Sequence, residues 1–242
     1  SMAENFYDQE KLLEKGRTGE SLGRYSAKTF FLMFLGLLVT FGVAVGCWVT
    51  NAMLYALYYI PYIHLIVLVA TLVLAFTMGR RIEKMRVGTA IAMFVAFSAL
   101  FGFTLSIYLY VYDLTVLTLC FLLTAVYFGA LAAYGFFTKR DLSNIWTILI
   151  SGTVFLIAFG VLTIFIPALS MGVFDRVVCM VGIATFLGWT AYNTQKIKAF
   201  YSYYSASPDM LAKASIFSAL QLYLDFINLF LYLLRFLGNK RR

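Results

Sequence analysis

The chain has 242 residues, of which 62% are hydrophobic and only 12% charged, and its mean hydropathy is +0.87. A soluble domain is about 45–50% apolar and about 25% charged, so this chain has too little polar surface to be soluble and is predicted to be an integral membrane protein. The formal net charge of +8 does not favour nucleic-acid binding. The basic residues are spread over short connections between apolar runs, where they indicate topology and contacts with lipid headgroups.

A polar amino-terminal segment, residues 1–28, precedes the first apolar run. A helix that spans a hydrocarbon layer of ~30 Å needs about 20 largely apolar residues. Seven runs meet that length: residues 29–49, 60–78, 88–110, 114–136, 145–166, 173–192 and 214–236. We predict an all-α bundle of seven transmembrane helices over residues 29–237, with its longest connection at 193–213 and a basic tail at 238–242. Strand-length segments of alternating polarity, typical of an outer-membrane barrel, are not seen.

The distribution of basic residues predicts the orientation in the cell membrane. The amino-terminal segment and the connections after the second, fourth and sixth runs carry most of them, whereas the opposite connections hold only Arg176. The positive-inside rule then places the amino terminus in the cytoplasm and, after seven crossings, the carboxyl terminus on the opposite side. Four basic residues near the carboxyl terminus conflict with this assignment: Arg235, Lys240, Arg241 and Arg242. A last segment that enters and returns is the alternative, but its length favours a full crossing.

Few side chains outside the last run suggest chemistry. Cys47, Cys120 and Cys179 each lie inside an apolar run without a paired spacing, so we expect buried thiols and neither disulfides nor a metal site. His64 has no second ligand at helical spacing. An intramembrane aspartyl protease needs two aspartates within the membrane, and only Asp225 lies there. A retinal protein needs a mid-membrane lysine in its last helix, whereas Lys213 is at the helix start. We therefore expect no enzyme activity and no cofactor.

One carboxylate, Asp225, lies in the middle of the last apolar run. An ionised aspartate near a bilayer centre costs roughly 2.5–3.5 kcal/mol on insertion scales. At spacings of three or four residues the same helix face carries Ser218, Gln221, Asp225, Asn228, Tyr232 and Arg235. Such a stripe must face other helices or water. It predicts either a hydrogen-bonded packing seam or a hydrated path for cations or protons, and the carboxylate favours the path, because amides alone would join helices without its cost.

Two adjacent arginines, Arg80 and Arg81, end the second run on the side expected to be cytoplasmic. Long basic side chains at the end of a membrane helix commonly extend to the lipid headgroups. The alternative is that one of them turns inward against a carboxylate and closes the mouth of a pore.

Two segments resemble a known family. AYNTQKI at 191–197 closes the sixth run, and ALQLYLDFINLFLYLLRF at 219–236 forms the last. With the seven helices, they resemble the bacterial branch of the transmembrane Bax inhibitor motif family over essentially the whole chain after the polar segment. The resemblance implies a pH-dependent calcium leak in which two aspartates share a proton. Asp225 matches the seventh-helix aspartate, whereas Asn193 stands where the family's Tyr-Asp-x-Gln pattern has the other.

The asparagine changes the chemistry that the resemblance implies. Two close carboxylates titrate as a coupled pair, but an Asn–Asp pair can only hydrogen-bond and carries one negative charge less. Calcium prefers several hard oxygen ligands, so its sensing is either lost here or shifted in pH. The family's arginine at the end of the second helix matches Arg80 or Arg81, with Gly79 competing for the position.

The sequence therefore predicts a pH-sensitive, calcium-permeable leak channel. Asp225 is the expected pore acid and a transient calcium ligand, Asn193 is its expected partner, and four further residues are candidates for the pore or its gate: Gln221, Asn228, Arg80 and Arg81. The expected partners are calcium, protons and the lipid bilayer, without nucleic acid. The alternative is a non-conducting membrane protein that regulates other proteins and whose polar stripe is a packing seam.

Overall fold

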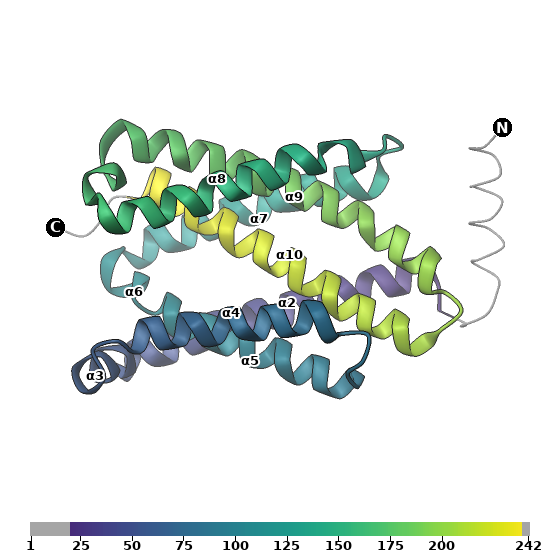
Figure 1. Ribbon diagram of the computed structural model, residues 1–242, viewed down its shortest axis with the longest axis horizontal. Helices are drawn as coiled ribbons and strands as arrows, with labels where there is room; N and C mark the ends of the chain where they lie inside the picture. Colours follow the sequence, from purple (N-terminus) through teal and green to yellow (C-terminus); the bar gives the residue numbers. More distant parts are fainter. Residues whose placement is uncertain (1–19, 239–242) are drawn as a thin grey trace. The chain divides into compact units, whose positions relative to one another are not determined.

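The computed structural model describes residues 20–238, and the regular elements in that range are all helical (Figure 1). In chain order they are α2 (Leu22–Val49), α3 (Ala52–Tyr59), α4 (Ile63–Arg81), α5 (Val87–Leu105), α6 (Tyr108–Val111), α7 (Leu114–Phe137), η1 (Leu142–Ile145), α8 (Trp146–Phe165), η2 (Pro167–Ser170), α9 (Gly172–Tyr204) and α10 (Pro208–Leu237). Within the described range, seven helical segments are long and apolar enough to cross a membrane. The predicted all-α membrane fold is confirmed.

The first membrane helix begins earlier than the apolar pattern predicted. Helix α2 starts at Leu22, inside the segment expected to be polar, and the Ser21 side chain accepts a hydrogen bond from the backbone N–H of Arg24 (3.2 Å). Such a cap satisfies one of the free N–H groups at a helix start. The tail predicted at 238–242 lies almost entirely outside the described residues, as does the segment 1–19.

The long connection predicted at 193–213 is wrong. Helix α9 continues to Tyr204 and α10 begins at Pro208, so only residues 205–207 join them. Residues 193–204 contain no glycine or proline, so nothing in the backbone ends the helix where the apolar run ends. Proline is well suited to the first turn of a helix, because its fixed φ matches and its missing N–H is not needed there.

The chain divides into two compact units, and both α9 and α10 contribute to each of them. The described part of the first unit comprises residues 20–110 and 196–223, and that of the second comprises residues 111–195 and 224–238. The most apolar stretch of α10 is 67% buried, against 11–39% for the other membrane-length helices. Helix α10 therefore supplies core residues to both units.

Hydroxyl groups join the helices of the first unit. Thr40 on α2 donates to the backbone oxygen of Ser98 on α5 (2.8 Å) and so accepts a hydrogen bond from the hydroxyl of Tyr223 on α10. The Tyr223 ring packs edge-on against Phe94 (5.8 Å between ring centroids). The Thr29 and Ser215 hydroxyls form a further hydrogen bond of 2.9 Å. Interhelical hydrogen bonds of this kind commonly hold membrane helices together, because the lipid offers no competing partner.

Aromatic rings and glycines form the core of the second unit. Phe226 on α10 packs against Phe121 and Phe128 on α7, with both pairs of ring centroids 5.4 Å apart. A Cβ at Gly182 on α9 would lie 2.6 Å from the Tyr232 ring, so α9 approaches α10 closely at this point. A Cβ at Gly135 on α7 would collide with the backbone of Ala191 on α9. These contacts fix α7, α9 and the second half of α10 against one another.

Candidate functional site

The carboxylate of Asp225 is buried inside the second unit. It lies near the middle of α10, and the residue is only 5% exposed. Its helix neighbours Leu224 and Phe226 are apolar. A carboxylate in such surroundings needs a hydrogen-bond donor, since an unpaired one would be very costly.

Asn193 on α9 provides that donor. Its side-chain Nδ2 donates to Oδ2 of Asp225 at 2.7 Å, and the residue is 6% exposed. Because an ionised carboxylate only accepts hydrogen bonds, the amide must present its NH₂ group. The neighbouring hydroxyls of Thr190 and Thr194 donate to the backbone of their own helix, to the oxygens of Phe186 and Thr190 respectively. The contact expected between the two motif residues is thus present, and the partner is neutral.

Two residues on, Gln195 has a structural role that the sequence did not indicate. Its Nε2 donates to the backbone oxygen of Arg140 (2.7 Å), and its Oε1 accepts from the backbone N–H of Leu142 (2.9 Å). Arg140 lies in the turn between α7 and η1, and Leu142 is the first residue of η1. In the same turn the carboxylate of Asp141 accepts from the backbone N–H of Ser143 (2.9 Å), and this hydrogen bond holds the pKa of Asp141 below its usual value. Gln195 therefore fixes the register of α9 against this turn.

The other polar residues of the predicted stripe are used in different ways. Asn228 is half-buried, and its amide donates to the backbone oxygen of Leu224 in its own helix (2.8 Å). Gln221 is also half-buried but lies in the part of α10 that belongs to the first unit. The structure does not bring either amide to Asp225 through a described hydrogen bond, so their predicted pore roles stay predictions.

A second carboxylate of this unit has a charged partner. Asp175, in the first turn of α9, forms an ion pair with Arg235 near the end of α10. The two side chains are 17% and 33% exposed. The sequence analysis did not predict this pair: it placed Arg235 in the polar stripe and among the basic residues near the carboxyl terminus, and it did not consider Asp175. The opposite charges at the two helix termini were the available signal, but no spacing rule connects residues so far apart.

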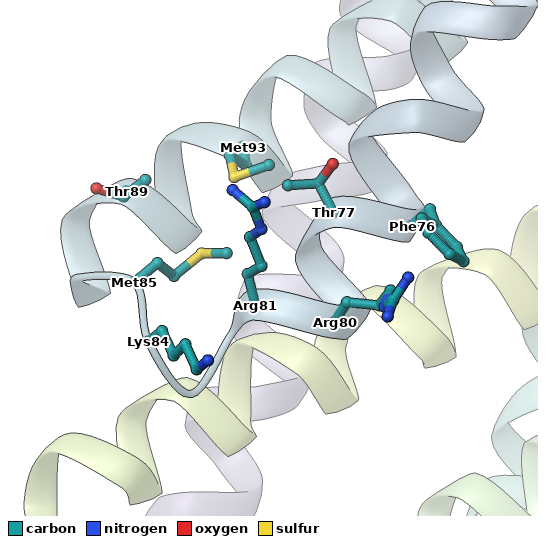
Figure 2. Close-up of a pocket in the computed structure, with 8 residues that line it drawn as sticks. All are labelled: Phe76, Thr77, Arg80, Arg81, Lys84, Met85, Thr89 and Met93. Atoms are coloured by element: carbon teal, nitrogen blue, oxygen red, sulfur yellow. The ribbon is translucent and has the colours of Figure 1, made fainter.

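Arg80 and Arg81 lie in the first unit, at the end of α4, and both are exposed. The Arg80 guanidinium lies over the Phe76 ring, 5.2 Å from its centroid. Within the described residues of this unit, neither arginine forms an ion pair with a carboxylate. Both line an open hollow between α4 and α5 (Figure 2). Their role as a latch on the pore acid stays a prediction.

Three buried hydroxyls of the first unit lack a partner among the described residues: Tyr25, Ser26 and Ser218. Each of the three residues is at most 6% exposed. Buried polar groups in native proteins nearly always have a protein or water partner, so hydroxyls of this kind mark places that favour water. Ser218 belongs to the predicted stripe on α10 and is 1% exposed, so this member of the stripe faces the protein interior and not lipid.

The fold and the site define a multi-pass α-helical membrane protein with one buried acid in its last helix. The chain matches the family described as "Inhibitor of apoptosis-promoting Bax1" over residues 22–242 and belongs to that family. The resemblance inferred from the two motifs is therefore confirmed, whereas the roles of individual residues rest on the geometry.

Relatives of the chain come from several bacteria. It is 35% identical to the inner membrane protein YbhL of Escherichia coli K12, an alignment that covers 91% of this chain and 93% of the relative. It is also 35% identical to an uncharacterised protein of Rickettsia prowazekii, with 92% of each chain covered. A Deinococcus radiodurans protein is 32% identical over 100% of this chain and 98% of its own length. The similarity thus extends over whole chains, and the printed name of the first relative agrees with a membrane location.

Proposed function

We propose that the protein is a pH-sensitive, calcium-permeable leak channel of the cell membrane, with Asp225 as the pore acid. The observation that carries the proposal is the buried contact between the Asp225 carboxylate and the Asn193 amide, 2.7 Å apart, in membrane-length helices. An amide donor orients the carboxylate but does not neutralise it. An ionisable residue in mid-membrane is costly, and in membrane proteins such residues typically mark ion or proton pathways.

The chemistry of this site suits a passing cation. One oxygen of the carboxylate accepts from Asn193, and an ionised carboxylate has further lone pairs that a calcium ion or a proton can use. Among residues 20–238 no group of three or more His, Cys, Asp and Glu side chains could hold a metal ion. The proposal therefore makes Asp225 a transient ligand and calcium a transported ion. It assigns no catalytic residue and no resident cofactor.

The pH sensitivity follows from the same residue. Protonation removes the only charge of the Asp225–Asn193 contact, so the attraction for cations falls. Since the partner is an amide, the site titrates as a single carboxylate and lacks the coupled titration of two aspartates. We also infer, from the basic residues, a cytoplasmic amino terminus and a carboxyl terminus on the opposite side.

A non-conducting interaction protein is the second candidate, and specific contacts favour it. Asn228 bonds to its own helix, and Arg235 pairs with Asp175, so two members of the predicted stripe are satisfied by packing. In that case Asp225 and Asn193 would form one more hydrogen bond between α9 and α10.

Calcium flux into liposomes separates the two candidates. Purified full-length protein is reconstituted into vesicles that contain a calcium indicator, and the flux is compared with that of protein-free vesicles. The channel proposal expects flux from the protein alone and at least about a tenfold loss in Asp225→Asn, which keeps the shape and removes the charge. Flux equal to the protein-free background, from protein that is folded and inserted, would support the interaction protein.

A further inference from the structure

A basic hollow lies at the end of α4 in the first unit. Its volume is about 940 Å³, and it is open to the surface. Three cationic side chains line it, namely Arg80, Arg81 and Lys84. In Figure 2 Arg81 extends from α4 toward Met93 on α5, whereas Arg80 turns the other way, toward Phe76. The hollow thus concentrates positive charge at the end of a membrane-length helix.

No acidic side chain lines this hollow. The turn that carries Lys84 also contains Glu83, but Glu83 lines a separate, smaller hollow with Lys213. The Lys213 ammonium donates to the backbone oxygen of Glu83 (3.1 Å) and pairs with Asp209 (2.8 Å). Helix α10 therefore holds the turn in place. The positive charge of the basic hollow is left without an internal counter-charge among the described residues of the unit.

The remaining lining is suited to an alkyl chain. Phe76, Met85 and Met93 contribute apolar surface, and the hydroxyls of Thr77 and Thr89 offer additional hydrogen bonds. The adjoining face of α4 is strongly exposed at Leu72 (60%) and Phe76 (64%). A ligand that matches both parts has an anionic head and an apolar tail.

We propose that the basic hollow is a binding site for an anionic phospholipid. The phosphate lies among the cationic side chains of the hollow, and an acyl chain runs along Phe76, beside Arg80, and the exposed face of α4. Basic pockets between membrane helices bind anionic headgroups, and a guanidinium group forms paired hydrogen bonds with phosphate oxygens. The site shares Arg80 and Arg81 with the predicted gate but contains neither Asp225 nor Asn193, so lipid binding is measured separately from calcium flux.

Native mass spectrometry of the purified full-length protein tests the proposal, with phosphatidylglycerol as the probe and phosphatidylcholine as the neutral comparison. The variant Arg80→Gln/Arg81→Gln/Lys84→Gln should bind phosphatidylglycerol at least about tenfold more weakly. The control Arg24→Gln/Lys139→Gln/Arg140→Gln removes the same charge from exposed positions outside the hollow. It should change binding by less than about twofold. Equal losses in the two variants would overturn the site, since they would indicate attraction by net charge alone.

Two further measurements distinguish a lipid phosphate from a soluble one. A single variant replaces the triple variant if the latter does not fold. Glycerol 1-phosphate in excess should not displace the lipid, and Phe76→Ala should weaken lipid binding. If glycerol 1-phosphate displaces the lipid and Phe76→Ala has no effect, the ligand is a soluble phosphate and the lipid proposal is overturned. If the triple variant does not fold, Arg81→Gln should reduce phosphatidylglycerol retention about fivefold, and unchanged retention would overturn the proposal.

Discussion

Two carboxylates of the second unit connect the same two helices, but their partners differ. Asp175 meets the guanidinium of Arg235 near the ends of α9 and α10, where both side chains are partly exposed. Asp225 meets the amide of Asn193 further from these helix ends, where it is 5% exposed. The first pair joins opposite charges, whereas the second joins a carboxyl group to a neutral amide in the more buried place.

The difference separates a structural contact from a candidate functional one. If both carboxylates served only to hold α9 against α10, the more buried one would have the greater need of a cation, because the cost of an unneutralised charge increases with burial. In this chain the Arg235 guanidinium instead pairs with the more exposed carboxylate, that of Asp175. This distribution agrees with the pore role proposed for Asp225, which needs the carboxyl group to be free of a fixed cation.

The largest expected effect comes from a change that displaces α9 at the Asn193 end. Gly135→Ala on α7 places a Cβ against the backbone of Ala191, 2.8 Å from its Cα and two residues from Asn193. The overlap of this Cβ with backbone atoms cannot be relieved by a rotamer change, so we expect a loss of about 1–3 kcal/mol in the free energy of unfolding. The Asn193–Asp225 contact should also lengthen, whereas the Asp175–Arg235 pair should persist.

The matched control is Gly129→Ala, because that position lies on the same helix with open space around it. It should leave stability unchanged or raise it slightly, since alanine is the better helix former. The two variants are compared by thermal unfolding in detergent. Equal midpoints would show that the close approach of α7 and α9 does not constrain the fold.

The next effect concerns the charged pair. Asp175→Asn leaves Arg235 with only a neutral partner, and for this partly exposed pair we expect a loss of about 1–2 kcal/mol. Arg235→Gln in the same background should cost less than in the natural protein, because the partners are then already uncoupled. A double-mutant cycle measured by unfolding in detergent gives the coupling energy. A coupling near zero would show that the pair does not stabilise the two helices.

The smallest change in structure is Asn193→Asp, which makes the second contact acidic on both sides. Two carboxylates this close cannot both ionise cheaply, so they titrate as a coupled pair. The curve of calcium flux against pH should therefore move relative to that of the natural protein. Superimposed curves would show that position 193 does not tune the pH response, and the inference from the family at this site would have to be abandoned.

The sequence predicted the membrane fold well, because long apolar runs admit few other structures in a bilayer. It misplaced the end of α9 and the start of α10, since apolar runs report where lipid contact ends and not where a helix ends. Residues 193–204 are polar at intervals but contain no residue that breaks a helix. The true signal for the connection was Pro208, at the start of α10.

The site could be predicted only in part. Asp225 was identifiable as a mid-membrane acid, and Asn193 was found through the family motif, because spacing alone does not connect residues on different helices. The Asp175–Arg235 pair and the turn contacts of Gln195 depend on how α7, α9 and α10 pack, which a single sequence does not specify. The basic hollow also depends on packing, and the sequence indicates only its two adjacent arginines, Arg80 and Arg81.

Calcium flux through Asp225→Asn and Asp175→Asn, measured side by side in the same liposomes and normalised to folded protein, tests the central claim most directly. Each variant replaces one carboxyl group of the α9–α10 contacts with an amide. The account predicts at least about a tenfold loss of flux in Asp225→Asn and less than about a twofold change in Asp175→Asn. Equal flux in the two variants would contradict it, because the buried carboxylate would then contribute no more to conduction than the neutralised one.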